Sequence, residues 1–187
     1  ALDSNAAYAY NELGLLERRT KNYAKSIVYF NKAHLCSPKW VFPIANLAAI
    51  YYDLDSPSKA IEFGIEAIRI DPESPLAHLN LAAAYELNKE YSKAKVEYAK
   101  TIQLDPSEKD SRINLCFMYY LEKDYIEAEK IIKEYKLLYP NDVTKYINAA
   151  LCIHMAQGEE TKAFELLESE IKKGFRDFKL IEEEPEL

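Results

Sequence analysis

Apolar residues recur along the chain with the period of an amphipathic helix. Between residues 46 and 54 they follow the i, i+3, i+4, i+7 spacing of one helical face, at Leu47, Ile50, Tyr51 and Leu54. A second such face follows at Ala60, Ile61, Gly64, Ala67 and Ile68. Between these faces, Ser56 and Pro57 have the order of an N-cap and a first-turn proline, and Pro72 ends the second face because it pushes the residue before it out of the α region. Residues 41–74 therefore predict two helices joined by a short turn.

The same pattern returns every 34 residues. The repeat aligns a column of small residues, which are Gly14, Ala48, Ala82, Cys116 and Ala150. It also aligns prolines at Pro38, Pro72, Pro106 and Pro140, and tyrosines at Tyr51, Tyr85 and Tyr119. Twelve residues after each small residue come Ser26, Ala60, Ala94 and Ala128, whereas one extra residue in the last copy moves its alanine to Ala163. Several columns with one period indicate a stack of repeated helix pairs, with small residues where two helices approach closely.

The segments "NLAAIYYDLDSPSKAIEFGIEAIRIDP" and "NLAAAYELNKEYSKAKVEYAKTIQLDP" resemble the tetratricopeptide repeat, a helix–turn–helix unit of 34 residues. The resemblance implies an all-α fold, namely a right-handed α-solenoid whose ten helices of about 12–14 residues form antiparallel pairs. It covers residues 7–176 as five repeats, after a leader segment at 1–6. The repeats span 7–40, 41–74, 75–108, 109–142 and 143–176.

The segment after the last repeat has the composition of a cover for the open end of the stack. Lys173 and Gly174 carry a C-cap signature. Apolar residues then follow at Phe175, Phe178, Leu180 and Ile181. We expect residues 177–187 to form a capping helix or the start of a continuing chain, since terminal units of such stacks need a cover.

Asparagine also recurs with the 34-residue period, on the first helix of each repeat from the second to the fifth. The column contains Asn46, Asn80, Asn114 and Asn148, whereas Glu12 stands at the equivalent place in the first repeat. In tetratricopeptide arrays the first helices line the concave groove. An asparagine side chain has donors and an acceptor on a short stem, so it can bond both the N–H and the C=O of an extended peptide. The column resembles the asparagine ladder of peptide-threading members of the family, which implies binding of a peptide segment.

Two other interpretations of the asparagine column remain. Each asparagine can instead satisfy backbone groups of the neighbouring helix, or the column can be inherited repeat consensus with no ligand. Apolar residues on the same helices are candidates either for peptide contact or for packing against the next repeat. They are Leu79, Leu87, Phe117, Leu121, Leu151 and Met155, and of these Leu87, Phe117 and Leu121 complete the predicted peptide site.

A second binding mode of the family is disfavoured. Carboxylate-clamp members grip chaperone tails with Lys and Asn on one first helix and with Lys and Arg two repeats later. Here the first pair of positions holds Asn11 and Leu15, or Ala45 and Ala49. The later pair holds Leu76 and Asn80, or Asp110 and Asn114, so only the central asparagine is present.

Composition narrows the classes of partner and site. The net charge of −7 argues against a nucleic-acid partner, and no apolar run approaches the roughly 18 residues that a membrane span needs. Only four glycines occur, which disfavours phosphate-binding loops, and we expect no small-molecule substrate. Cys36, Cys116 and Cys152 form no CxxC motif, so we interpret them as small apolar residues of a reducing compartment, the cytoplasm. Because the chain begins at Ala1, we expect it to be a piece of a longer protein.

Catalytic and metal-binding patterns are weak. His34, His78 and His154 are far apart in sequence, and we interpret each as a buried or groove histidine. We predict no enzyme activity, no cofactor and no metal site. The predicted function is a protein-interaction module that binds an extended peptide. The alternatives are a structural or oligomerising scaffold that uses the convex face or the array ends, and a substrate-selecting region of a larger enzyme.

Overall fold

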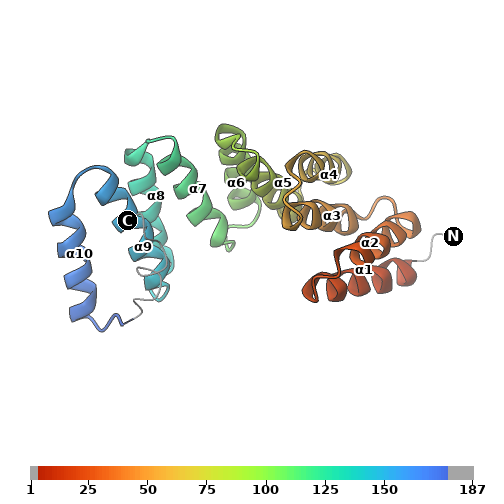
Figure 1. Cartoon of the computed structure of the whole chain (residues 1–187), viewed down its shortest axis with the longest axis horizontal. Coiled ribbons are helices and arrows are strands. Elements are labelled where there is room, and N and C mark those ends of the chain that lie inside the picture. The colour runs from red at the N-terminus through yellow and green to blue at the C-terminus, as the bar shows by residue number, and fades with distance from the viewer. Residues whose placement is uncertain (1–3, 177–187) are drawn as a thin grey trace. The chain divides into compact units, whose positions relative to one another are not determined.

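The computed structural model describes residues 4–176, and these residues form ten α-helices and no strand (Figure 1). The first six are α1 (Ser4–Arg19), α2 (Tyr23–Cys36), α3 (Val41–Asp53), α4 (Pro57–Ile70), α5 (Pro75–Leu87) and α6 (Tyr91–Leu104). The other four are α7 (Asp110–Leu121), α8 (Tyr125–Leu138), α9 (Val143–Ala156) and α10 (Glu160–Lys172). The fold is an all-α solenoid of helical repeats, which confirms the predicted fold class.

The helices have nearly the predicted lengths. Helices α2 to α10 each contain 12–14 residues, whereas α1 contains 16. Consecutive helices lie side by side as hairpins, with α1 against α2, α3 against α4 and α5 against α6 in residues 1–108. The described residues from 109 onward, up to residue 176, form a second compact unit in which α7 packs on α8, and α9 on α10. The hairpins of α3 to α10 lie within the predicted repeats 41–74, 75–108, 109–142 and 143–176, whereas the first hairpin begins at Ser4, three residues before the predicted start at residue 7.

The turn inside each hairpin uses one residue in the left-handed region. These residues are Lys21, Asp55, Lys89, Lys123 and Gly158, with φ between 51° and 73°. Only the fifth turn has glycine there, the residue that adopts positive φ without steric cost. It follows the extra residue of the fifth copy, which lengthens the first helix of that repeat so that α9 ends at Ala156.

The small-residue column lies where two helices of a hairpin approach closely, as the repeat predicts. Ala48 and Ala82 are fully buried and Cys116 is 2% exposed. The hydroxyl of Ser26 donates to the carbonyl oxygen of Gly14 at 2.7 Å. The thiol of Cys116 lies 3.3 Å from the Ala128 carbonyl oxygen in the fourth repeat, between equivalent positions. These contacts explain why the residue twelve positions after each small residue is also small.

Gly14 shows how strictly one position of this column is limited. A methyl group at Gly14 would lie 2.5 Å from Cε1 of Phe30, whose side chain is fully buried. The aromatic ring therefore fills the space that a side chain at Gly14 would need. Phe30 belongs to an apolar core with Ile44, Leu47 and Ile50 that joins α2 to α3.

Contacts between neighbouring repeats join residues about one repeat apart. Arg18 on α1 pairs with Asp53 on α3 at 2.7 Å, and Lys136 on α8 pairs with Glu170 on α10 at 3.0 Å. First helices of adjacent repeats also contact one another, with α3 against α5 in the first unit and α7 against α9 in the second. The first helices thus form a continuous layer within each unit.

Cys116 is expected to be chemically inert. Burial, with a smaller effect of the Cys152 thiol, raises the pKa of the Cys116 thiol to about 12. The reactive species is the thiolate, so the fraction available at neutral pH is far below that of a free cysteine. We expect Cys116 to react with a thiol reagent at least ~100-fold more slowly in the native chain than in the chain unfolded by urea. Mass spectrometry of the modified peptides would measure this rate, with half-buried Cys36 as the internal comparison.

A polar network links the start of α7, whose N-cap residue is Lys109, to the start of α9 in the second unit. The carboxylate of Asp142, the N-cap residue of α9, accepts from Nζ of Lys109 at 2.7 Å and from the hydroxyl of Tyr135 at 2.8 Å. The hydrogen bond from Lys109 is the main cause that holds the pKa of Asp142 below its ordinary value, although partial burial opposes it.

Asp142 should therefore make the fold more stable above about pH 4 than below it. A carboxylate whose pKa is lowered by folding stabilises the protein above its unfolded pKa of about 3.9, and that contribution is lost as the pH falls through the folded pKa. We expect Asp142→Asn to lower the free energy of unfolding by about 1 kcal/mol at pH 7. Below pH 3, the difference in free energy of unfolding between the variant and the wild type should become smaller. Urea melts at several pH values would measure both. If the stability difference between the wild type and Asp142→Asn does not change with pH, the Asp142 carboxylate does not stabilise the fold through its charge.

Part of the predicted terminal architecture lies outside the described residues. This holds for residues 1–3 of the predicted leader segment and for the predicted capping segment 177–187. Within the leader segment, α1 already begins at Ser4. Over residues 4–176, no helix combines the length and the apolar character that a membrane span requires.

Candidate functional site

A groove of about 730 Å³ lies within the second unit, between α7, α9 and α10. This volume is within the range of ligand-binding pockets. Its walls come from α7 with Asp110, Ile113, Asn114 and Phe117, from α9 with Lys145, Asn148, Ala149, Leu151, Cys152 and Met155, and from α10 with Ala163, Phe164 and Leu167. The short side chains of Ala149 and Ala163 leave room between the three helices.

The lining changes in character along the helices. Asp110 and Lys145, near the N-terminal ends of α7 and α9, form an ion pair. Asn114 and Asn148 follow about one turn further along the same helices. Phe117 lies one turn beyond Asn114. The groove thus has a charged end, a middle with two side-chain amides, and an apolar end.

The apolar end is open to solvent. Phe117 and Met155 are each 39% exposed, and Phe164 is 66% exposed. Large apolar side chains that share one groove and remain exposed are typical of a binding surface, whereas single exposed apolar residues are common on any protein. Three large apolar side chains therefore form an exposed apolar surface at this end of the groove.

The two asparagines of this groove are half-buried. The side chain of Asn148 makes no hydrogen bond with any residue in the range 4–176. Asn114 has at least one polar partner. A half-buried amide such as that of Asn148 is free to hydrogen-bond a ligand that enters the groove.

The two asparagines of the first unit bond inside the array. Asn46 is 6% exposed, and its amide donates to Oδ1 of Asn11 at 3.0 Å. The amide of Asn80 donates to the carbonyl oxygen of Ala45 on α3 at 2.7 Å. The Asn80 bond matches the interpretation in which asparagine satisfies backbone groups of the neighbouring helix, whereas Asn46 bonds a side chain.

The predicted apolar site residues are distributed over both units. Phe117, Leu151 and Met155 line the groove. Leu121 is 38% exposed at the end of α7 and lies outside the groove lining, and Leu87 is half-buried on α5 in the first unit.

Sequence reasoning missed the wall that α10 contributes. Phe164 and Leu167 lie on a second helix of a repeat, whereas the predicted peptide site was confined to first helices. A local signal exists, because Phe164 directly follows Ala163, which the extra residue of the fifth copy displaces from its column. The ion pair between Asp110 and Lys145 was also missed.

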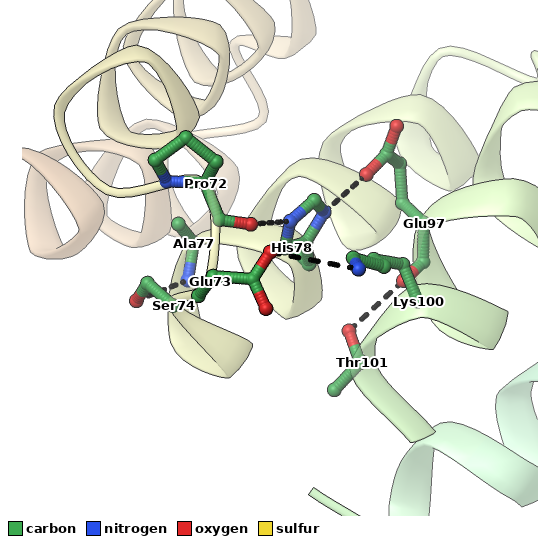
Figure 2. A network of polar contacts seen from close by, with 8 residues as sticks. All are labelled: Pro72, Glu73, Ser74, Ala77, His78, Glu97, Lys100 and Thr101. Carbon is green, nitrogen blue, oxygen red and sulfur yellow. Dashed lines mark hydrogen bonds and ion pairs between the residues drawn. The ribbon is translucent and has the colours of Figure 1, made fainter. Parts of the chain in front are cut away.

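His78 has a structural environment (Figure 2). Its ring lies between the carbonyl oxygen of Pro72, 2.9 Å from Nε2, and the carboxylate of Glu97, 2.6 Å from Nδ1. A carbonyl oxygen only accepts, so Nε2 carries a hydrogen. His78 thus links α5 to α6 and to the preceding turn, and its two ring nitrogens are both engaged. Over residues 4–176, no three side chains of His, Cys, Asp or Glu are grouped so that they could hold a metal ion.

Comparisons with known proteins agree with the repeat. Residues 7–33 match the sequence model of the tetratricopeptide repeat. No curated protein matches the sequence. Among solved structures, the crystal structure of MamA protein has a TM-score of 0.76 and 18% identity, and the match covers 90% of this chain and 91% of MamA. A thermophilic tetratricopeptide-repeat protein of Thermus thermophilus has a TM-score of 0.69 and 17% identity, with 94% and 95% coverage.

A third similar structure contains a peptide. It is the first tetratricopeptide-repeat domain of Spaghetti (RPAP3), bound to the HSP90 peptide SRMEEVD. Its TM-score is 0.62 with 20% identity, and the match covers 65% of this chain and 97% of that domain. At these identities the similarity shows a common fold.

Proposed function

Since the chain is a tetratricopeptide-repeat protein, we propose that it is a non-catalytic interaction module that holds an extended segment of a partner protein in the groove between α7, α9 and α10. The observation that carries this proposal is the pair of amides, Asn114 and Asn148, beside the exposed apolar residues of one groove. The tetratricopeptide fold is one of protein-interaction modules, and the Spaghetti domain holds a peptide in its solved structure.

Each part of the groove has a role in this proposal. The amide of Asn148 offers donors and an acceptor to the main chain of the segment, and Asn114 lies at the equivalent place one repeat earlier. Phe117 and Phe164 cover its apolar side chains. Asn46 and Asn80 contribute differently, because their amides already bond Asn11 and Ala45. We therefore assign peptide contact first to Asn148, whose side chain makes no hydrogen bond within residues 4–176, and place Asn114 beside it in the same groove lining.

Chaperone tails are not the proposed ligand. Asp110 and Asn114 stand where a carboxylate clamp needs its later Lys and Arg. Lys145 is the only cation among the described groove residues, and it is paired with Asp110. A terminal carboxylate would have to break this pair to bind there, so the segment is held along its length.

A second candidate is a scaffold that binds through α8. Leu137 is 82% exposed and Ile126 is 77% exposed. The two residues are eleven positions apart, about three helical turns, so they share one stripe of α8. These two residues are the basis of the scaffold alternative for the second unit.

One pair of variants distinguishes the two candidates. Peptides selected on the whole immobilised chain from a random phage-displayed library would be titrated by calorimetry against Phe164→Arg and, as its matched control, Leu137→Arg. Both positions are exposed, so both variants should fold. We expect Phe164→Arg to weaken binding about tenfold or more, because a charge would enter the apolar end, whereas Leu137→Arg should change affinity less than about twofold. The reverse result would favour the scaffold.

A further inference from the structure

We propose that the segment in this groove is extended, carries no charge where it crosses Asn114 and Asn148, and places one large apolar side chain at the end formed by Phe117, Met155 and Phe164. This inference rests on the proposed function and deepens it. It names the class of segment that the groove accepts and the order of apolar, uncharged and charged residues along that segment.

Charge is the first argument. Asp110 and Lys145 are the only ionisable acidic or basic side chains of the described groove lining, and they pair with one another. The described lining therefore presents no net charge, and its middle and apolar end hold no charged side chain that could form an ion pair. A charged side chain bound there would lose its water without a compensating partner, which is strongly unfavourable. The complementary segment is uncharged over this length.

The apolar end is the second argument. Two aromatic rings and a thioether come from three different helices there, and each remains at least 39% exposed. Methionine has a flexible, polarizable side chain that adapts to differently shaped apolar groups. This combination suits a large aliphatic or aromatic anchor without selecting one residue type.

The amides decide between an extended and a helical ligand. A helix uses its own backbone N–H and C=O groups internally, so it would cover Asn148 without offering it a backbone partner. A buried amide left without a partner carries a substantial cost. An extended segment has free N–H and C=O groups at every residue, which can satisfy the asparagine side chain. The unpaired Asn148 thus favours an extended main chain.

The order of groups along the groove also gives the segment a direction. Its anchor lies at the end where α9 turns into α10, and its main chain crosses the amides. Beyond them it reaches Asp110 and Lys145, where polar or charged residues of the ligand can meet water and the ion pair. Charges are therefore expected only on the side of the segment away from the anchor.

The test uses selected peptides that lose affinity for the whole chain with Phe164→Arg. In each peptide, alanine replacement first identifies the core, which is the set of residues whose replacement weakens binding. The large apolar residue whose replacement by alanine weakens binding most is then changed to Asp. In a separate peptide, one backbone N–H of the core is replaced by N-methyl. The matched control carries N-methyl at a residue outside the core. We expect the Asp change and the core N-methyl each to weaken binding about tenfold or more, and the control to have no effect. Between about 0.05 and 0.5 M NaCl, affinity should change less than about twofold, since the contact region holds no unpaired charge.

Failure of this inference differs from failure of the proposed function. Peptides that depend on Phe164 but carry a charged core, bind more weakly as salt rises, tolerate core N-methylation or become helical on binding would overturn the inference alone. Circular dichroism of the bound peptide would detect the last case. If no selected peptide responds to Phe164→Arg, the groove is not a peptide site, and both proposals are wrong.

Discussion

Replacing Phe30 with alanine is expected to lower the free energy of unfolding by about 3–5 kcal/mol, the largest stability loss that we predict. The side chain is fully buried between α1 and α2 and belongs to the core that continues into α3. Its loss removes apolar contacts and leaves a cavity that Gly14 cannot fill. Urea unfolding followed by circular dichroism would measure the change.

Two controls make this prediction specific. Val28→Ala lies on the same helix, but Val28 is 52% exposed, so the change should cost less than about 1 kcal/mol. Gly14→Ala should destabilise the wild type, because the new methyl would meet the Phe30 ring, but it should be tolerated in the Phe30→Ala background. Additive effects of the two changes would show that the close approach of Gly14 and Phe30 does not limit the packing.

The helices and their small-residue contacts could be predicted from the sequence because they follow from local rules. Apolar spacing and the proline columns determine where helices begin and end, and a repeat must place equivalent residues in equivalent surroundings. Cys116 was thus predicted to be buried between two helices, and the structure confirms this with 2% exposure. Such contacts lie within one hairpin and depend on residues only twelve positions apart.

The asparagine column shows where this reasoning stops. Asn46, Asn80 and Asn148 are equivalent in the repeat, yet their side chains differ. The first bonds a side chain, the second bonds a backbone carbonyl, and the third makes no hydrogen bond within residues 4–176. The difference depends on the previous repeat. In the first repeat, Asn11 lies one residue before the column position, and its side-chain oxygen accepts a hydrogen bond from Asn46. No periodic rule predicts that pairing.

The α10 wall of the groove was missed for a related reason. An ideal repeat assigns second helices to the packing of the stack, so Phe164 was not considered for binding. In the fifth repeat, one extra residue shifts Ala163 and Phe164 relative to the column. Which side chains then face a groove depends on three-dimensional packing at the departure from the repeat, which the columns themselves do not describe.

The second large effect that we predict is a loss of peptide affinity when Asn114 and Asn148 of the second unit are replaced. We expect Asn114→Ala together with Asn148→Ala to weaken binding of the selected peptides about tenfold or more. Each lost hydrogen bond contributes about 0.5–1.5 kcal/mol, and the loss is larger where a ligand amide stays buried without a partner. About 1.4 kcal/mol corresponds to a tenfold change in affinity. For Asn148→Ala alone, the melting temperature should barely change, because this amide bonds nothing in the described chain.

Asn46→Ala is the matched control from the same column. It leaves Oδ1 of Asn11, itself 4% exposed, without its partner, so we expect a stability loss of about 1–3 kcal/mol with no change in peptide affinity. The column would thus divide into a structural pair in the first unit and a binding pair in the second. If instead Asn114→Ala with Asn148→Ala lowers the melting temperature as much as Asn46→Ala and leaves affinity intact, the whole column stabilises the stack. The partner would then be held by other surfaces, of which the exposed stripe of Ile126 and Leu137 on α8 is the first to test.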